Sequence, residues 1–116
     1  MISRYRPNTT IMRLFSTKTG GQLIYDRLLF NGTKDVFMYS GGAVMPLIDA
    51  FYDSKIDYHI HTHEQNCGHA ATGYARVSNS PGIVVTTSGP GLTNCITPML
   101  DAHNDSTPLI VLSGQV

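Results

Sequence analysis

The sequence predicts an α/β protein with a doubly wound parallel sheet and helices on both of its faces. Short apolar segments alternate with longer segments of helical spacing, and the connections between them are short. The segment at 83–87 shows no polar alternation until Thr86, which is typical of a strand buried on both faces of a parallel sheet. Because crossovers between parallel strands are right-handed, we expect one continuous parallel sheet.

The first half of the chain supplies two helices and a strand. A helix is predicted at 22–30, since its leucines and isoleucine recur near helical spacing and Asn31-Gly32 follows as a stop signal. A short strand is expected at 35–39. After a glycine loop, a second helix is expected at 43–52, where Pro46 is tolerated in the first turn.

The second half continues the alternation of strands and helices. A buried strand at 57–61 is expected to lead into a helix at 64–77, whose many small residues allow close approach to its neighbours. After the strand at 83–87 a helix is predicted at 91–103, and Pro98 is expected to bend it or to move its start. A further buried strand is predicted at 109–113.

Bulk composition limits the function classes. The chain has 116 residues, 41% of them hydrophobic, and a formal net charge of zero. This length suits one domain. The charge offers no electrostatic case for nucleic acid or an anionic surface. No apolar segment of about 18 residues is present, so we expect no membrane partner. Cys67 and Cys95 are interpreted as buried free thiols rather than a disulfide scaffold.

Residues 1–19 differ from the rest of the chain. No acidic residue precedes Asp26, whereas basic and hydroxyl side chains are common in this segment. That composition is typical of an organelle-targeting presequence and predicts a mitochondrial protein, with plastid or cytoplasm as alternatives. A simple basic tail, or a start at Met12, would also explain it. Residues 20–116 are then the folded domain.

Glu64, the only glutamate, is the best candidate for chemistry. It lies where the strand at 57–61 gives way to a helix, and the strand at 83–87 runs into the tight turn at 88–91. Open α/β sheets bind ligands at the carboxyl edge of such strands. A carboxylate there can act in proton transfer to a heterocycle nitrogen. The structural alternative is a favourable interaction with the helix dipole, about 0.3–1 kcal/mol.

The residues suggest two other kinds of site. The turn at 88–91 could hold a phosphate, but it lacks both the P-loop ending and the spacing of a dinucleotide site. A turn that lets a planar ring approach the backbone is favoured, with a second such turn at 40–42. His59, His61 and His63 alternate like half of a zinc site, but no further ligand completes it, so packed histidines are favoured and no metal is assigned.

Several short motifs occur in a fixed order between Gly20 and Val116. They are Gly41-Gly42-Ala43, His63-Glu64-Gln65, Gly73-Tyr74-Ala75-Arg76, Thr87-Ser88-Gly89-Pro90-Gly91-x-x-Asn94, Thr97-Pro98-Met99, Asp105-Ser106-x-Pro108 and Gly114-Gln115-Val116. Each motif alone is weak, but the ordered set is specific. It resembles the pyrimidine-binding domain of thiamine diphosphate enzymes, most closely the catalytic subunit of acetolactate synthase.

The resemblance implies a role for each matching position. Glu64 resembles the glutamate that hydrogen-bonds the aminopyrimidine nitrogen and sets the protonation of the cofactor. Gln115 resembles a glutamine near the substrate side. The positions that resemble residues around the pyrimidine ring are Tyr39, Gly41, Gly42, Thr87, Gly89, Pro90 and Asn94. Ser40, where the family usually has proline, departs from the pattern.

The family reaction decarboxylates pyruvate and joins the product to a second 2-keto acid, which begins branched-chain amino acid biosynthesis. The family site is completed across a homodimer or higher oligomer. Complete family enzymes also use Mg²⁺ and FAD, whose sites are not among these residues. The resemblance therefore implies a partial, truncated thiamine diphosphate-binding fold. Because no diphosphate or Mg²⁺ site is among these residues, we expect the isolated chain to be inactive. Because its last strands lack cover, we expect it to be poorly stable or to associate. The alternatives are a non-catalytic fragment or interaction module, or a related carboligase, oxidase or 2-hydroxyacyl-CoA lyase.

Overall fold

A computed structural model describes residues 18–115 of the chain. Its core is a four-stranded parallel sheet in the order β2-β1-β3-β4. The strands are β1 (Asp35–Met38), β2 (Asp57–Ile60), β3 (Gly82–Thr86) and β4 (Leu109–Ser113). The helices are α2 (Gly20–Phe30), the 3₁₀-helix η1 (Gly42–Val44), α3 (Met45–Asp49), α4 (Glu64–Ser78), α5 (Pro90–Thr93) and α6 (Ile96–Asn104).

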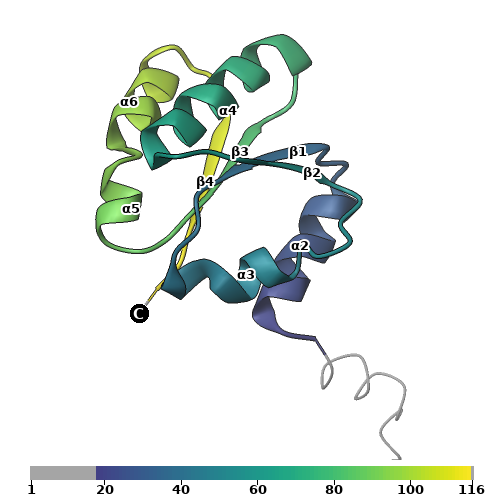
Figure 1. The fold of residues 1–116 in the computed structure, drawn as a ribbon. Coiled ribbons are helices and arrows are strands. Elements are labelled where there is room, and N and C mark those ends of the chain that lie inside the picture. Colours follow the sequence, from purple (N-terminus) through teal and green to yellow (C-terminus); the bar gives the residue numbers. More distant parts are fainter. Residues whose placement is uncertain (1–17, 116) are drawn as a thin grey trace, which may run out of the picture.

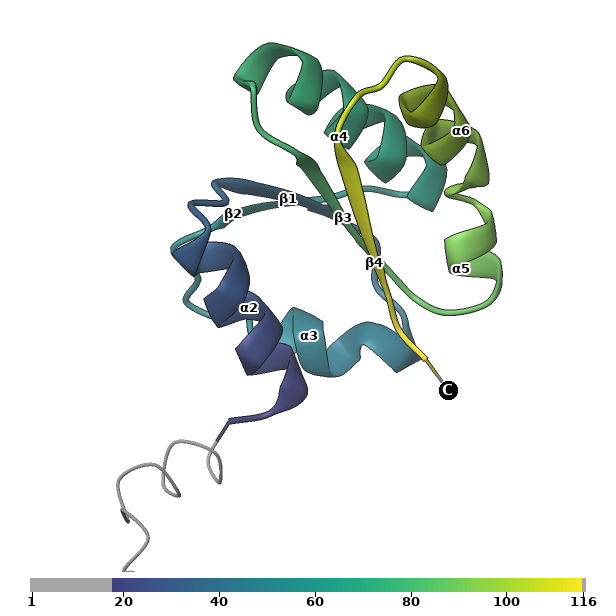
Figure 2. The same ribbon diagram turned by 180° about the vertical axis from the view of Figure 1, so that it is seen from behind.

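Helices cover both faces of the sheet, as Figures 1 and 2 show from opposite sides. The helices α2 and α3 lie on one face, and α4, α5 and α6 lie on the other. From β1 the chain moves to one side to form β2, then crosses back over β1 to β3 and continues outward to β4. This doubly wound parallel arrangement confirms the predicted fold class. In the described part of the chain no helix combines the length and the apolar character needed to cross a membrane.

Side-chain alternation along β1 and β3 divides the interior into two cores. Val36 and Met38 of β1 face α2 and α3, whereas Phe37 between them faces α4. On β3, Val84 likewise faces α4, within the cluster that contains both cysteines. Successive strand residues point to opposite faces, so the residue two positions after Val84 also lies on the α4 side.

The first helix begins earlier than the hydrophobic spacing predicted. The N-cap is Thr19, whose side chain accepts a hydrogen bond from the Gln22 backbone amide, while the Gln22 side chain accepts one from the Thr19 amide. This capping box satisfies two amides that the first turn leaves without helical partners. Lys18, which precedes this helix, forms an ion pair with Asp26 within it. The remainder of the proposed presequence, residues 1–17, lies outside the described residues.

Two predicted helices are shorter or broken. The helix expected at 43–52 is η1 followed by the five-residue α3, which ends at Asp49. The helix expected at 91–103 is divided into α5 and α6, with a turn at Asn94 and Cys95. Pro98 is the third residue of α6, where its missing amide costs no helical hydrogen bond, so the proline moved the start as expected.

The burial predicted for two strands is wrong. All four residues of β2 are exposed, and β4 alternates between half-buried and exposed positions. Both strands lie at the edges of the sheet among the described residues. An edge strand has only one neighbour, so apolar composition alone did not reveal its position.

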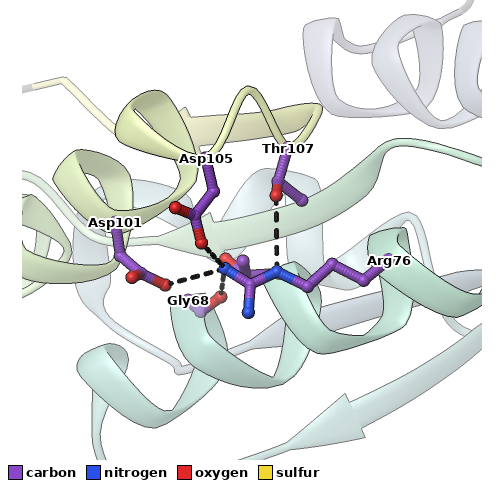
Figure 3. Close-up of polar contacts among 6 residues, drawn as sticks. Gly68, Arg76, Asp101, Asp105 and Thr107 are labelled. Atoms are coloured by element: carbon purple, nitrogen blue, oxygen red, sulfur yellow. Dashed lines mark hydrogen bonds and ion pairs between the residues drawn. The ribbon is translucent and has the colours of Figure 1, made fainter.

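The α4 and α6 helices pack closely, both in the amino-terminal half of α4 and near its carboxyl end. A Cβ atom on Gly68 would lie 2.3 Å from Cγ of Pro98, so only glycine permits this approach. Near the other end, Arg76 Nη2 donates to Asp105 Oδ2 at 2.5 Å and to Asp101 Oδ2 at 3.4 Å (Figure 3).

Candidate functional site

The loops after β1, β3 and β4 converge at the carboxyl edge of the sheet. A Cβ atom on Gly41 would lie 2.4 Å from Cβ of Thr87, and one on Gly114 would lie 2.4 Å from the carbonyl oxygen of Ala43. The Gly114 amide also donates to the carbonyl of Thr86 at 3.1 Å. The neighbouring strands β1 and β3 lead to connections on opposite faces, so these loops lie at the switch point where open α/β sheets bind ligands.

Glu64 reaches the same place from α4. It is the first residue of this 15-residue helix, whose N-cap is His63. The His63 Nδ1 atom accepts a hydrogen bond from the Gln65 amide at 3.1 Å. The Glu64 side chain is buried, with 7% of its surface exposed. Interaction with the dipole of α4 also stabilises an exposed carboxylate, so the dipole does not require the side chain to be buried.

The two oxygens of the Glu64 carboxylate differ in their contacts. Oε2 accepts a hydrogen bond from Asn94 Nδ2 at 3.0 Å. Oε1 has no hydrogen bond among the residues that the structure describes. A Cβ atom on Gly91 would lie 3.2 Å from this free oxygen, 2.9 Å from Thr86 Oγ1 and 2.7 Å from Thr87 Cγ2. The start of α5 is therefore packed against the carboxylate, and the turn at 88–91 lies beside Glu64 as expected.

The glycines of the two turns have two different uses. Gly41 and Gly91 allow the loops to touch, because side-chain atoms occupy the places where their Cβ atoms would be. Gly89 has a φ of 61°, which glycine adopts without strain. A Cβ atom on Gly42 or Gly89 would meet no atom within 4 Å. A planar ring could therefore approach the backbone at Gly42 and Gly89, but not at the two packed glycines.

The remaining predicted residues surround this edge. The Tyr39 amide donates to the Val85 carbonyl at 3.1 Å, and its side chain packs against the core on the α4 side. Pro90 is exposed and begins α5, with its ring in the first turn. Gln115 is exposed and follows Gly114 beyond the end of β4. The structure thus brings every predicted site residue to one edge, with Gln115 at its rim.

Both cysteines are buried free thiols, as predicted, and they lie beneath Glu64. The Cys95 thiol donates to the Glu64 carbonyl at 3.7 Å, and the Cys67 thiol donates to the His63 carbonyl at 3.6 Å. Burial, followed by the nearby Cys95 and Glu64, raises the pKa of Cys67 from 9.0 to about 12. Burial and then Glu64 also raise the pKa of Cys95. The floor of the site is therefore apolar and poorly hydrated.

The three alternating histidines do not gather into one site, although two of them contact Phe37. The His59 ring stacks on Phe37 at 5.0 Å between centroids, and its Nε2 is 2.8 Å from Asp35 Oδ1. His61 is half-buried near the same phenylalanine, and its Nε2 is buried with no hydrogen-bond partner among the described residues. His63 caps α4. The described part of the chain contains no group of three or more potential metal ligands.

A groove of about 690 Å³ lies elsewhere, between α6 and β4. Its lining includes Ile96, Met99, Leu100 and His103, all from α6, and it contains none of the predicted site residues. The groove follows from the half-covered edge at β4. It is not evidence about the chemistry at Glu64.

Sequence reasoning missed two residues of the site. The pattern favoured packed histidines and gave His63 no role of its own, yet it serves as the N-cap, a place more often taken by Ser, Thr, Asp or Asn. Thr86 was predicted only as part of a buried strand, yet its hydroxyl faces the carboxylate region. A polar residue within an otherwise apolar central strand is the signal that could have identified it.

Comparison with known proteins shows which family these residues match. Residues 18–116 match the family model described as thiamine pyrophosphate enzyme, N-terminal TPP binding domain. The chain is 52% identical over 103 residues to the mitochondrial acetolactate synthase catalytic subunit of Aspergillus candidus, covering 88% of this chain and 15% of that protein. The mitochondrial acetolactate synthase of Schizosaccharomyces pombe has the same identity and coverage.

A bacterial relative shows the same pattern. The large subunit of acetolactate synthase isozyme 2 of Escherichia coli is 44% identical over 97 residues, covering 84% of this chain and 18% of that protein. The chain thus spans less than a fifth of the length of these curated relatives. The family match to residues 18–116 includes all four described strands.

Proposed function

Because the chain belongs to the thiamine pyrophosphate enzymes and carries their N-terminal TPP binding domain, we propose that it forms the pyrimidine-binding part of an acetolactate synthase catalytic subunit. The complete reaction would decarboxylate pyruvate and join the product to a second 2-keto acid. One observation supports the proposal most strongly. The only glutamate in the chain is buried at the switch point and keeps one oxygen without a hydrogen bond among the described residues.

The residues present fit an aminopyrimidine. A buried carboxylate without a strong partner loses solvation, so it favours a ligand that supplies a hydrogen bond. Glu64 Oε1 is available for such a bond, while Asn94 orients the carboxylate through Oε2. The positions at Gly42 and Gly89 leave the backbone open to a flat ring. When bound, thiamine diphosphate supplies the electron sink for decarboxylation of a 2-keto acid.

The contribution of this chain is to hold and protonate one end of that cofactor. Glu64 would hold or exchange a proton at Oε1 and so set the protonation of the ring nitrogen. The two thiols below it, Cys67 and Cys95, are fully buried, so they form a floor that excludes water. Tyr39, Thr87 and Pro90 would pack around the ring, and Gln115 would face the substrate.

The remainder of the reaction requires groups outside the described residues. In this proposal the diphosphate end, Mg²⁺ and FAD are bound elsewhere in a complete enzyme, and a homodimer or higher oligomer completes the site. Branched-chain amino acid biosynthesis is then the biological setting. A related carboligase, oxidase or 2-hydroxyacyl-CoA lyase would use the same Glu64 chemistry, but the named relatives favour the synthase.

We also propose a mitochondrial location. Residues 1–19 have the composition of a presequence, and the two fungal relatives are named as mitochondrial. Fluorescence microscopy of the chain fused to a fluorescent protein, with and without residues 1–19, tests this. Mitochondrial signal that depends on the segment supports the proposal, and diffuse signal with both forms contradicts it.

Calorimetric titration with thiamine diphosphate tests the proposed function. The wild-type chain should bind the cofactor saturably. Glu64→Gln should bind about 10- to 100-fold more weakly, because a hydrogen bond to a charged group contributes about 1.5–3 kcal/mol. Asp57→Asn is the matched control, since this exposed acid is the first residue of β2 and lies at the amino ends of the strands, away from the site. Equal affinities for all three proteins would contradict the proposal.

A further inference from the structure

Thr86 carries a buried hydroxyl whose partner the structure does not show. The residue is 0% exposed, and its Oγ1 has no hydrogen bond among the described residues. An unsatisfied buried hydroxyl costs about 1–3 kcal/mol, so such a group calls for an explanation. Valine would fit the same strand position without this cost.

The surroundings of this hydroxyl identify an acceptor. Thr86 is two residues after Val84 and therefore shares the face of β3 that packs against α4. The point where Gly91 would carry a Cβ atom lies 2.9 Å from Thr86 Oγ1 and 3.2 Å from Glu64 Oε1. The donor and the acceptor both lack a hydrogen bond among the described residues, and both lie within 3.2 Å of that point at the start of α5.

We infer that Thr86 is a positioning residue whose hydroxyl donates to Glu64 Oε1 once a side-chain rotation brings the two atoms within hydrogen-bond distance. Asn94 then holds one carboxylate oxygen and Thr86 the other, so the plane of the carboxylate is fixed. Each carboxylate oxygen can accept more than one hydrogen bond, so Oε1 still has room for a ring nitrogen. The inference deepens the proposed function and rests on it, because it explains how the carboxylate is aimed before any cofactor arrives.

Other titratable groups near Glu64 do not supply this contact. From α4 the nearest are His63, whose Nδ1 accepts from Gln65, and the Cys67 thiol. From the turn between α5 and α6 comes the Cys95 thiol, which donates to the Glu64 carbonyl rather than to its carboxylate. Both thiols remain protonated throughout the range in which a carboxylate titrates, since burial raises their pKa values.

The single glutamate makes the test direct. Cell-free synthesis with carboxyl-labelled carbon-13 glutamate gives one glutamate carboxyl signal, which belongs to Glu64. The pH at the midpoint of its titration is measured without ligand for the wild-type chain, Thr86→Val and Thr86→Ser. Valine keeps the shape but removes the donor, so the midpoint should move upward by about one pH unit. Serine keeps the donor, so its midpoint should stay near that of the wild type.

Three outcomes are distinguishable. An upward shift in Thr86→Val but not in Thr86→Ser supports the inference. Equal midpoints in all three folded proteins overturn it and leave the hydroxyl a packing feature only. Thr86→Ala replaces the valine variant if the latter does not fold. Because the measurement uses no cofactor, a shift without any thiamine diphosphate binding would support the role of Thr86 while contradicting the proposed function.

Discussion

The two ends of α4 hold their charges in opposite ways. At the amino end, Glu64 is 7% exposed and receives one hydrogen bond, from the neutral side chain of Asn94. At the carboxyl end, the Arg76 side chain is 46% exposed and pairs with two acids that are about equally exposed (Figure 3). The exposed Arg76 has two charged partners, whereas the buried Glu64, which loses more solvation, has one neutral partner.

This difference supports the proposal that Glu64 has a functional role, whereas the charge of Arg76 is structural. Exposed ion pairs contribute about 0–1 kcal/mol, and removing them changes little. A buried carboxylate with few partners lowers stability, so its presence requires another explanation. The proposed recognition of a ligand by Glu64 supplies one.

The largest effect on stability is expected from crowding the buried end. Gly91→Ala would place a methyl group within 3.2 Å of Glu64 Oε1 and closer still to both threonines. We expect a loss of about 1–3 kcal/mol in the free energy of unfolding, measured by urea denaturation. Gly42→Ala, which would meet no atom within 4 Å, is the control. Equal stabilities of the two variants would show that the carboxylate is not tightly enclosed.

A pair of substitutions in the middle of α4 sharpens the comparison. Gly68→Ala would bring its Cβ atom to 2.3 Å from Pro98 Cγ and should destabilise the protein by about 1–2 kcal/mol. Gly73→Ala, in the same helix with nothing within 4 Å, should stabilise it by about 0.5–1 kcal/mol. Urea denaturation should therefore show changes of opposite sign in the free energy of unfolding of the two variants. The same sign for both would mean that α4 and α6 are not in close contact.

The buried Cys67 thiol beneath Glu64 predicts that the stability of the folded protein falls at alkaline pH. The pKa of Cys67 rises from 9.0 to about 12 on folding, because burial disfavours the thiolate. The folded protein then keeps a proton that the unfolded chain releases. Stability from this group is present below pH 9.0 and is lost as the pH rises toward about 12. Urea midpoints of Cys67→Ala should fall less over this range than those of the wild type; parallel curves would contradict the burial.

The smallest effect is expected at the exposed end. Arg76→Met removes the ion pairs with Asp101 and Asp105 but keeps an apolar stem of similar length. The free energy of unfolding should fall by less than about 1 kcal/mol, and the loss should shrink in high salt. Thermal denaturation at low and high salt measures both. A loss that salt leaves unchanged would indicate that the arginine acts by packing.

The sequence predicted the parts of this contrast that depend on local chemistry. The position of Glu64 between a strand and a helix, the turn at 88–91 and the effect of Pro98 all follow from residue types and spacing. Edge strands were mistaken for buried ones, because β2 and β4 carry apolar residues whose burial depends on neighbours far along the chain. The same limit concealed the hydrogen bond from Asn94 to Glu64 and the position of the Thr86 hydroxyl beside Gly91, which join residues from different elements.

The most direct test of the central claim follows the Glu64 carboxyl carbon-13 signal when each half of thiamine is added separately. We predict that the aminopyrimidine half moves this signal saturably, because its ring nitrogen meets Oε1, whereas the thiazole half leaves it in place. If the thiazole half alone moved the signal, or if neither half did, Glu64 would not be the residue that meets the ring, and its proposed role in cofactor binding would be wrong.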